Sequence, residues 1–429
     1  MIMTNPRLFA RSLFDRAIEA AEPAQAVRRS LREAPLPSLP DGRLIVLAVG
    51  KAACAMMEEA LKHVPKSVTP QAIAVTNYEN ARPIKGCEVI AAGHPVPDKN
   101  GLKAARQIAD ALVNSGPSDF VLTLISGGGS ALLPSPTAGI TLEDKIKTNE
   151  LLLRNGYDIT EINLIRQQLS DLKGGGLTRL ASPSAVRSLI ISDVIGDDLR
   201  VIASGPTVTR IGTAAQAAEL LRTRGHLKML PKDVRTHLLD DNTQPSDVHA
   251  QVQNQLICSN RFSLDAMLDA ADVWAPIVVA DDLQGDVTNA AVEIAKFIQS
   301  QKASGPRVFL WGGETTVNVT GTGRGGRNQE LALRVALLLK NTPGNWVFLS
   351  GGTDGRDGPT DAAGGLIDAK TIERIETAGG DIEQLLTNCD SYHALSMAND
   401  LLVTGSTGTN VADVQVFVRD GLVVRDGLD

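Results

Sequence analysis

Aromatic and cysteine residues are scarce in this chain of 429 residues, and their scarcity excludes several kinds of site. Phenylalanine, tryptophan and tyrosine together make up 3% of the residues, too few for the stacking platforms on which single-stranded nucleic acids bind. The four cysteines form no C-x-x-C pair; they are Cys54, Cys87, Cys258 and Cys389. Neither a disulfide framework nor a thiolate zinc site is expected, and this use of cysteine fits a protein of a reducing compartment.

Long apolar runs and an excess of basic charge are also missing. No apolar stretch approaches the ~18 residues that a membrane-spanning helix needs. The 42 basic and 49 acidic residues give a net charge of −7, which argues against a general polyanion binder but permits a local positive cleft. Charges scattered among the first twenty residues predict an amphipathic helix and not a signal peptide. We expect a cytoplasmic protein that binds neither nucleic acid nor membrane.

The chain does contain the alternation of short apolar runs and amphipathic stretches that is typical of a wound α/β sheet. Its length exceeds what one hydrophobic core usually serves, so two domains are expected. We predict a Rossmann-like parallel-sheet domain over residues 1–245 and a second α/β domain with a mixed sheet over residues 246–429. The active-site cleft is expected between them. The polar stretch Asp240–Asp247 is the predicted linker.

Polar residues follow four predicted strands of the first domain at the point where each strand ends. The strands are Leu44–Val49, Glu88–Ala92, Phe120–Ile125 and Arg187–Ile191. The residues that follow them are Lys51, His94, Ser126 and Asp193. Functional groups of such sheets gather where the strand carboxyl ends meet helix N-termini, so we expect them here. A loop histidine such as His94, between a glycine and a proline, is more often structural than catalytic.

The last third of the chain has a different pattern. Two short predicted strands, Val308–Trp311 and Thr315–Val319, are separated only by Gly312-Gly313-Glu314. Three residues are too few for the helix that a parallel crossover needs, so an antiparallel or mixed sheet is expected.

Two runs of three glycines predict anion-binding loops. In Ser126-Gly127-Gly128-Gly129-Ser130 the missing Cβ atoms let backbone N–H groups turn toward one point, and a following helix start adds positive charge. A plain tight turn would need only one or two glycines. The loop is not a P-loop, because the chain has no G-x-x-x-x-G-K-[ST]. In Lys173-Gly174-Gly175-Gly176 a cationic side chain precedes the second run of three glycines. The end of a helix would need only one of these glycines.

Lys51 and Asp193 are candidate catalytic residues. A cation directly after a buried strand can neutralise a transferring phosphoryl group or hold a carboxylate; the alternative is a solvated lysine in a first helical turn, which the helix dipole disfavours. Asp193 begins an acidic strand tip and is a candidate general base or Mg²⁺ ligand. Asp197 and Asp198 nearby are as well explained as caps of the next helix.

The second half contains two further candidate loops. Gly321–Gly326 matches G-x-G-x-x-G, but its strand resembles part of a hairpin and its helix opens with Arg327 and other large residues, which opposes a dinucleotide site. Arg327 indicates instead a clamp on carboxylate or phosphate. Asp354, Asp357 and Asp361 alternate with glycines and can hold a metal or orient a hydroxyl, although they do not fit the EF-hand spacing. A plain polar loop is the alternative.

Taken together, nine segments resemble the glycerate 2-kinase family, whose C-terminal half is called the MOFRL domain. They are AVGKAA (48–53), GHPVPD (93–98), ISGGGSALL (125–133), LKGGGL (172–177), SDVIGDD (192–198), IASGPT (202–207), GGETTV (312–317), GTGRGGRNQE (321–330) and GTDGRDGPTDAAG (352–364). The resemblance implies an enzyme that phosphorylates D-glycerate with ATP and Mg²⁺ to give 2-phosphoglycerate. Some members carry the label hydroxypyruvate reductase, so an NAD(P)H-dependent reductase is the alternative. A non-catalytic anion binder is a third possibility, but it would not need the carboxylates.

Phosphoryl transfer depends on positioning and charge neutralisation, and the candidate residues divide accordingly. The predicted nucleotide ligands are Gly127, Gly128, Gly129, Ser130, Lys173 and Gly174. The predicted substrate ligands are Lys51, Ser126, Arg327 and Asp354, and the predicted catalytic residues are Lys51, Asp193 and Arg327. The predicted metal ligands are Asp193, Asp354 and Asp361. Nucleotide preference and oligomeric state stay open, with a homodimer among the options.

Overall fold

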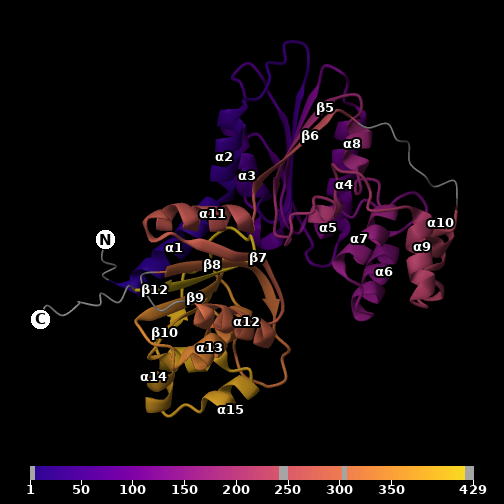
Figure 1. Ribbon diagram of the computed structural model, residues 1–429. Helices are drawn as coiled ribbons and strands as arrows, with labels where there is room; N and C mark the ends of the chain where they lie inside the picture. The colour runs from indigo at the N-terminus through magenta and orange to yellow at the C-terminus, as the bar shows by residue number, and fades with distance from the viewer. Residues whose placement is uncertain (1–4, 241–249, 302–306, 421–429) are drawn as a thin grey trace, which may run out of the picture. The chain divides into compact units, whose positions relative to one another are not determined.

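The computed structural model describes residues 5–240, 250–301 and 307–420, which divide into two units (Figure 1). The central unit is Pro23–Ile257, and the terminal unit joins Met1–Glu22 to Cys258–Asp429. The chain therefore changes unit at residue 257, and its first helix belongs with the C-terminal part. The expected division at residue 245 and nearly all of the predicted linker Asp240–Asp247 lie outside the described residues.

The central unit is built on a six-stranded sheet in the order β3-β2-β1-β4-β5-β6. The strands are β1 Leu44–Val49, β2 Gln71–Asn77, β3 Glu88–Ala92, β4 Phe120–Ile125, β5 Ala185–Ile191 and β6 Val252–Cys258. Strands β1 to β5 pair in parallel, as predicted, while β2 and β6 were not predicted. Because the strand order reverses between β1 and β4, their carboxyl ends flank the topological switch point where such sheets bind ligands.

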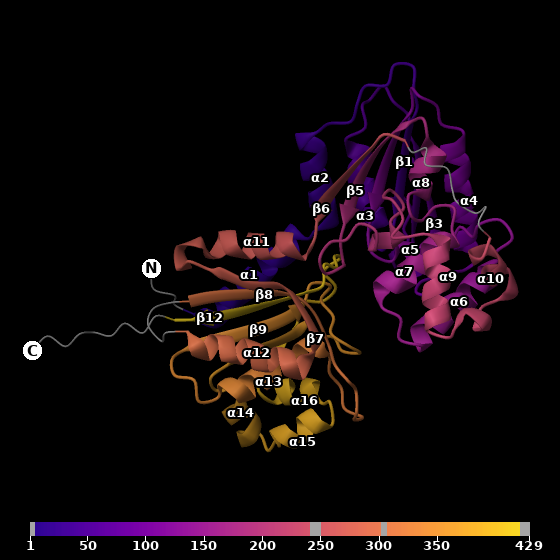
Figure 2. The same ribbon diagram turned by 45° about the vertical axis from the view of Figure 1, so that its right-hand side comes forward.

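Helices cover both faces of this sheet (Figure 2). Helices α2 Pro23–Glu33 and α3 Ala53–Lys62 pack together on one face, and α4 Lys99–Val113 and α8 Gly176–Ala181 pack on the other. All six residues of β1 are buried, so its apolar run without alternation is the pattern of a strand covered on both sides.

Four more helices of the central unit have a small core of their own. They are α6 Leu142–Arg154, α7 Ile159–Gln168, α9 Ala214–Thr223 and α10 Lys232–Leu238. Their core includes Leu152, Ile165 and Leu221. Helices α6, α7 and α9 each begin with a capping box, in which two side chains satisfy N–H groups of the first turn.

The terminal unit has a mixed six-stranded sheet in the order β11-β10-β9-β12-β8-β7. Its strands are β7 Ile277–Asp286, β8 Arg307–Thr316, β9 Trp346–Gly352, β10 Gly364–Asp368, β11 Leu401–Leu402 and β12 Asp413–Arg419. The mixed sheet is as predicted, but the hairpin within 308–319 is wrong because β8 continues through the two glycines. Strand β12 pairs antiparallel with β8 and β9, and β10 pairs antiparallel with β9 and β11, whereas β7 and β8 pair in parallel. Gly313 is required there because a Cβ on it would lie 2.1 Å from the Leu283 carbonyl oxygen of β7.

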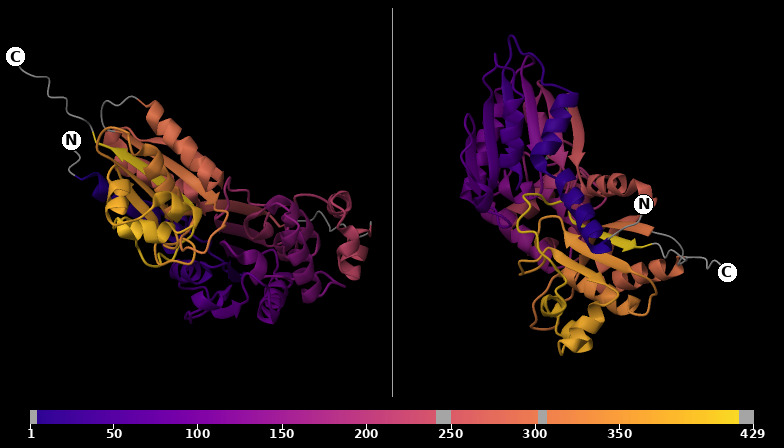
Figure 3. Two further views of the ribbon diagram at one scale, coloured as in Figure 1. Left: turned by 90° about the horizontal axis from the view of Figure 1, so that it is seen from below. Right: turned by 90° about the vertical axis from the view of Figure 1, so that its left-hand side faces the viewer.

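Helices also cover both faces of the second sheet. Helices α1 Pro6–Ala20 and α11 Asn260–Ala271 pack on one face. On the other face lie α12 Val287–Ser300, α13 Arg327–Leu339, α14 Thr371–Thr377, α15 Ile382–Thr387 and α16 Ser391–Met397. Figure 3 shows the indigo α1 beside the yellow strand β12, although these segments are far apart in the sequence.

Helix α1 belongs to the terminal unit because its buried face and its first charged residue both find partners there. Phe14 reaches the sheet at Gly351, where a Cβ would lie 2.7 Å from the phenylalanine ring. Arg7 forms ion pairs with Asp368 and with the buried Asp400, the latter at 2.8 Å. Among the described helices, none has both the length and the apolar run that a bilayer crossing takes.

Candidate active site

In the central unit, hydrogen bonds join the segments that follow β1 and β4 at the switch point. The backbone N–H of Lys51 donates to the Gly127 carbonyl at 2.9 Å, and the Ser126 hydroxyl accepts a hydrogen bond from the Ala52 N–H at 3.1 Å. Gly50 is needed because a Cβ on it would lie 2.1 Å from Ser126 Oγ. Ser126, predicted to bind substrate, is buried and holds the two turns in register.

Three predicted residues surround the glycine loop 126–130. A Cβ on Gly127 would lie 1.9 Å from Asp193 Oδ2, and one on Gly128 would lie 3.1 Å from His94 Cδ2 and 3.3 Å from Lys51 Cγ. The structure thus brings Lys51, His94 and Asp193 to one loop from the ends of β1, β3 and β5. Among the described residues, none accepts a hydrogen bond from the N–H groups of residues 127–130. Free N–H groups at such a turn form an anion cradle.

The charged groups around this loop favour the binding of an anion and provide a candidate base. Lys51 is exposed, and its ammonium forms no ion pair with any described residue. Burial raises the pKa of Asp193, against the effects of its own backbone N–H and of Lys51, so its carboxylate is a stronger base than an exposed aspartate. Burial, together with Lys51, lowers the pKa of His94, although Glu79 opposes this. These effects together favour the neutral form of the His94 imidazole.

The second glycine run has a structural role. The N–H groups of Gly174 and Gly175 donate to the carbonyls of Ser204 and Gly205 at 3.1 and 2.9 Å, so Gly174 has no free N–H for a phosphate. Lys173 is 3% exposed, and its Nζ donates to the carbonyls of Ser130 and Leu133 at 2.6 and 3.0 Å. The lysine thereby braces the first glycine loop.

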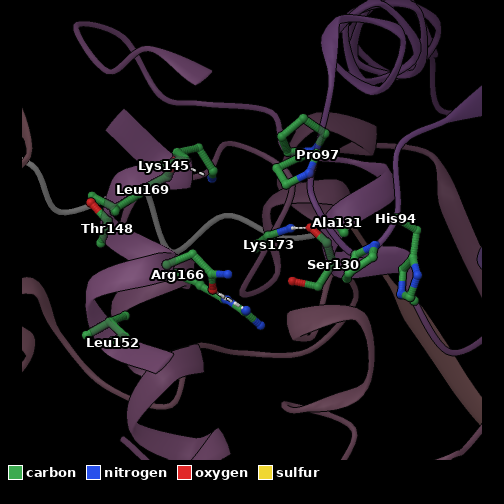
Figure 4. Close-up of a pocket in the computed structure, with 14 residues that line it drawn as sticks. His94, Pro97, Ser130, Ala131, Lys145, Thr148, Leu152, Arg166, Leu169 and Lys173 are labelled. Atoms are coloured by element: carbon green, nitrogen blue, oxygen red, sulfur yellow. Dashed lines mark hydrogen bonds between the residues drawn. The ribbon is translucent and has the colours of Figure 1, made fainter. Parts of the chain in front are cut away.

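A cavity of about 240 Å³ lies beside the glycine loop and shares Gly128 and Ser130 with it (Figure 4). Besides loop residues it is lined by Lys145, Thr148 and Asn149 of α6, by Arg166 of α7, and by Lys173. Sequence reasoning did not find the residues of α6 and α7. The one signal is that Lys145, Thr148 and Leu152 share a helix face with the spacing of a buried stripe.

Arg327 and Asp354 are neighbours in the terminal unit. Arg327 begins α13 and binds Asp413 through Nε and Nη2 at 2.6 and 2.9 Å. Its Nη1 lies 3.1 Å from Glu314. Burial raises the pKa of Asp354, as does Asp413, while Arg327 lowers it. The guanidinium is therefore already held by carboxylates.

Other residues of these loops are structural. Asp357 accepts hydrogen bonds from the Asn328 and Gln329 N–H groups at 3.1 and 2.8 Å, which caps α13. Asp361 is exposed and accepts a hydrogen bond from the Tyr392 hydroxyl at 2.7 Å. Within the described residues, no group of three or more acidic, histidine or cysteine side chains is gathered closely enough to hold a metal.

The glycines of the 321–326 loop are needed for close packing. A Cβ on Gly321 or Gly323 would lie 2.3 or 2.6 Å from the Asn388 carbonyl oxygen, and one on Gly326 would lie 2.3 Å from the Asp357 carboxyl carbon. The loop is packed against its own unit and does not form a dinucleotide cradle.

Two family models match the chain. Residues 9–239 match a domain of unknown function, DUF4147, and residues 307–413 match the MOFRL family. The second match covers most of the mixed sheet, and the first covers most of the central unit together with part of α1.

Relatives match over nearly the whole chain. A D-glycerate 2-kinase of Thermotoga maritima is 37% identical over 95% of this chain and 96% of its own length. A glycerate 2-kinase of Pyrococcus horikoshii is 36% identical over 97% of this chain and 98% of its own length. A protein of Agrobacterium vitis with the provisional name hydroxypyruvate reductase is 40% identical over 96% of this chain and 94% of its own length.

Solved structures agree with the sequence matches. The crystal structure of a Thermotoga maritima glycerate kinase superimposes with a TM-score of 0.88 at 35% identity, covering 96% of this chain and 99% of that one. A Pyrococcus horikoshii protein superimposes with a TM-score of 0.85 at 35% identity, covering 98% of this chain and 100% of that one. The chain belongs to the MOFRL-domain glycerate 2-kinase family.

Proposed function

We propose that the protein is a glycerate 2-kinase, which transfers the γ-phosphoryl group of ATP to D-glycerate and releases 2-phosphoglycerate and ADP. The observation that carries this proposal is the glycine loop at the β1–β4 switch point. Its N–H groups are free among the described residues, and it is flanked by the partly buried Asp193 and by Lys51, which forms no ion pair with a described residue. The names of the Thermotoga and Pyrococcus relatives support the substrate.

In the proposed reaction the 2-hydroxyl oxygen of glycerate attacks the γ-phosphorus, and the bond from that phosphorus to the bridging β–γ oxygen breaks. Asp193 accepts the hydroxyl proton, a role that its raised pKa suits. Lys51 and the N–H groups of the loop neutralise the charge on the transferring group, as phosphoryl transfer requires. Lys173 holds the loop in shape through the Ser130 and Leu133 carbonyls.

A magnesium ion bound with ATP fits the residues of the central unit. Mg²⁺ is usually held by one or two carboxylates together with substrate phosphates, and Asp193 is a carboxylate directly against the proposed phosphate loop. The ion would supply further charge neutralisation on the phosphates. Asp193 is therefore a candidate for either role, base or metal ligand. Asp361 is a weaker candidate because it is exposed and already bonded to Tyr392.

Arg327 and Asp354 remain candidates for binding the glycerate carboxylate and hydroxyl. Arg327 would have to exchange its half-exposed partner Glu314 for the substrate carboxylate, while Asp413 keeps the guanidinium oriented. Arg327→Lys retains the charge but not the paired bonds to Asp413. We expect it to raise the KM for glycerate more than the KM for ATP.

The deciding experiment compares two assays on the same purified protein. ADP release is measured with D-glycerate, ATP and Mg²⁺, with L-glycerate and omission of Mg²⁺ as controls. NADH oxidation is measured with hydroxypyruvate. We expect ADP release that requires both D-glycerate and Mg²⁺. NADH oxidation without any ADP release would overturn the kinase and establish the reductase.

A further inference from the structure

Three cationic side chains from separate elements share the cavity beside the glycine loop. Lys145 lies on α6, Arg166 on α7, and Lys173 after α7. Lys145 and Lys173 are 9% and 3% exposed, and none of the three forms an ion pair with a described residue. Burial disfavours the charged form of such groups unless an anion compensates it, so a cluster of this kind suits an anionic ligand.

Each of these side chains is held in place and still has donors to offer. Lys145 Nζ donates one hydrogen bond, to the Leu169 carbonyl at 2.8 Å, and in its protonated form keeps two N–H groups. Arg166 Nε donates to Asn149 Oδ1 at 2.9 Å, and its Nη1 has no partner among the described residues. Figure 4 shows Lys145, Thr148 and Arg166 along one wall, with Lys173 between them and Ser130.

Thr148 gives independent evidence for a missing polar ligand. Its side chain is 2% exposed and lines the cavity, yet its hydroxyl has no hydrogen-bond partner in the described part of the chain. Buried side-chain polar atoms are mostly satisfied in folded proteins. An acceptor in the cavity would satisfy the hydroxyl and the free N–H groups of the cations together.

The size and position of the cavity identify the class of ligand. Pockets for whole drug-sized molecules measure ~300–1,000 Å³, so a cavity of about 240 Å³ takes a small anion or one segment of a larger molecule. Three cations suit a multiply charged segment. Because Gly128 and Ser130 belong both to the cavity and to the glycine loop, a bound chain would continue to the loop.

We propose that this cavity binds the phosphate chain of the nucleoside polyphosphate donor, with Lys145, Thr148, Arg166 and Lys173 as its ligands. The inference rests on the proposed kinase function, which it deepens by placing the donor. The terminal phosphate then lies at the glycine loop, beside Lys51 and Asp193. Pro95, Pro97 and Pro134 line the cavity as well.

Proton uptake by the lysines of the cavity gives a second way to detect a bound anion. Burial lowers the pKa of Lys145 to about 7, with a further lowering by Arg166 and a partial offset by Asp171. Burial, Lys145 and Arg166 lower the pKa of Lys173. An anion among these groups raises both pKa values, so binding at pH 7.5 should take up protons. Calorimetry in buffers of different ionisation enthalpy measures that uptake.

The test uses direct binding to the full chain by titration calorimetry, with MgADP, inorganic tripolyphosphate and adenosine as probes. The cavity variants are Lys145→Met, Arg166→Gln and Thr148→Val. The matched control is Lys147→Met, which removes an exposed lysine on the same helix that pairs with Glu143 at 2.6 Å. Circular dichroism and thermal melting confirm that each variant folds.

We expect the Kd of MgADP and of tripolyphosphate to rise about tenfold or more in Lys145→Met and Arg166→Gln, since each loses a cationic partner of the ligand. Thr148→Val, which changes neither charge nor volume much, should show a smaller rise of the same sign. The control should bind as wild type does, and the KM for D-glycerate should change less than twofold. Lys145→Met should also take up fewer protons on binding than wild type does.

Two outcomes would overturn the inference. One is unchanged binding of MgADP in folded cavity variants. The other is tripolyphosphate binding that depends on the cavity but does not compete with MgADP, which would make the cavity an independent anion site. A different result would contradict the kinase function alone. If MgADP binding depended on the cavity but no ADP were released from ATP and glycerate, the donor site would be supported and the kinase activity would not.

Discussion

The Asp193 carboxylate occupies the space that a side chain at position 127 would fill. A Cβ on Gly127 would come within 1.9 Å of Asp193 Oδ2. The absence of that atom lets the candidate base lie directly against the loop whose N–H groups face the proposed phosphate. One residue position therefore links the charge-neutralising loop to the group that accepts the proton.

Gly127→Ala should displace Asp193 and lower kcat by about 10²-fold, the scale at which a shift of about 1 Å affects catalysis. Folding should survive, because the clash is with one side chain that can rotate. Gly116→Ala is the control, since a Cβ there meets nothing within 4 Å. Steady-state kinetics on both variants would check this. Equal, wild-type turnover in both would show that the contact of loop and carboxylate has no catalytic role.

Lys51→Ala should lower kcat by ~10²-fold or more, the cost of losing one group that stabilises developing charge. It should also move the acid limb of the kcat–pH profile to higher pH, because Lys51 lowers the pKa of Asp193. The sign follows from the role of a base: activity falls when the carboxylate is protonated, and removing a nearby cation makes protonation easier. Lys66→Ala, an exposed lysine elsewhere in the central unit, is the control. A large drop in kcat without any shift of the acid limb would show that Lys51 does not influence the ionisation of the catalytic base.

Asp193→Asn distinguishes a general base from a metal ligand. The amide preserves shape but takes no proton, so a base predicts unchanged MgADP affinity and a collapse of turnover at every Mg²⁺ concentration. A metal ligand predicts that raising Mg²⁺ restores much of the rate. Turnover should be measured across a Mg²⁺ titration. Full activity at ordinary Mg²⁺ would exclude both roles.

Residues at the ends of parallel strands could be predicted to meet. Lys51, the 126–130 loop and Asp193 each follow an apolar run, and the carboxyl ends of neighbouring parallel strands lie at one edge of a sheet. Their convergence therefore needs only the strand pattern and the strand order. The central sheet and the mixed terminal sheet follow from similar local signals.

Features that depend on contacts between distant segments could not be predicted. Lys145 and Arg166 meet only because α6 and α7 pack as a pair, and no motif marks that contact. Helix α1 belongs to the terminal unit because Phe14 and Arg7 have their partners there. The glycine run makes Gly174 resemble a phosphate ligand, but in the structure its N–H donates to the Ser204 carbonyl.

The cap of α13 is the clearest case of such a distant contact, and it yields a stability prediction. Gly326 precedes the helix and has no side chain to cap it, so Asp357, about thirty residues later, accepts the two first-turn N–H bonds. Asp357→Ala leaves both N–H groups without an acceptor. Loss of a cap costs about 1–2 kcal/mol, and these groups are buried, so the terminal unit should lose at least that much free energy of unfolding.

The charge of Asp357 adds a pH dependence whose sign can be worked out. Burial raises its pKa to about 6, against the two backbone N–H bonds that lower it. Because the folded pKa lies above the ordinary value of 3.8, the stability that it contributes is present at low pH and is lost as pH rises from about 4 through about 6. Asp357→Asn keeps one acceptor oxygen and cannot ionise, so it lacks this loss. Its stability relative to wild type should therefore rise over that range, whereas Asp357→Ala should stay below wild type throughout.

The three tryptophans of the chain, Trp274, Trp311 and Trp346, all belong to the terminal unit, so their fluorescence in urea titrations follows the unfolding of that unit alone. Titrations between pH 4.5 and 7.5 on wild type, both Asp357 variants and Asp361→Ala would check the prediction. Asp361 is an exposed aspartate of the same loop, and its removal should leave the urea midpoint unchanged. If wild type and Asp357→Asn kept a constant difference across this range, Asp357 would not carry a buried charge. If Asp357→Ala unfolded at the wild-type midpoint, the distant cap would not hold α13 in place.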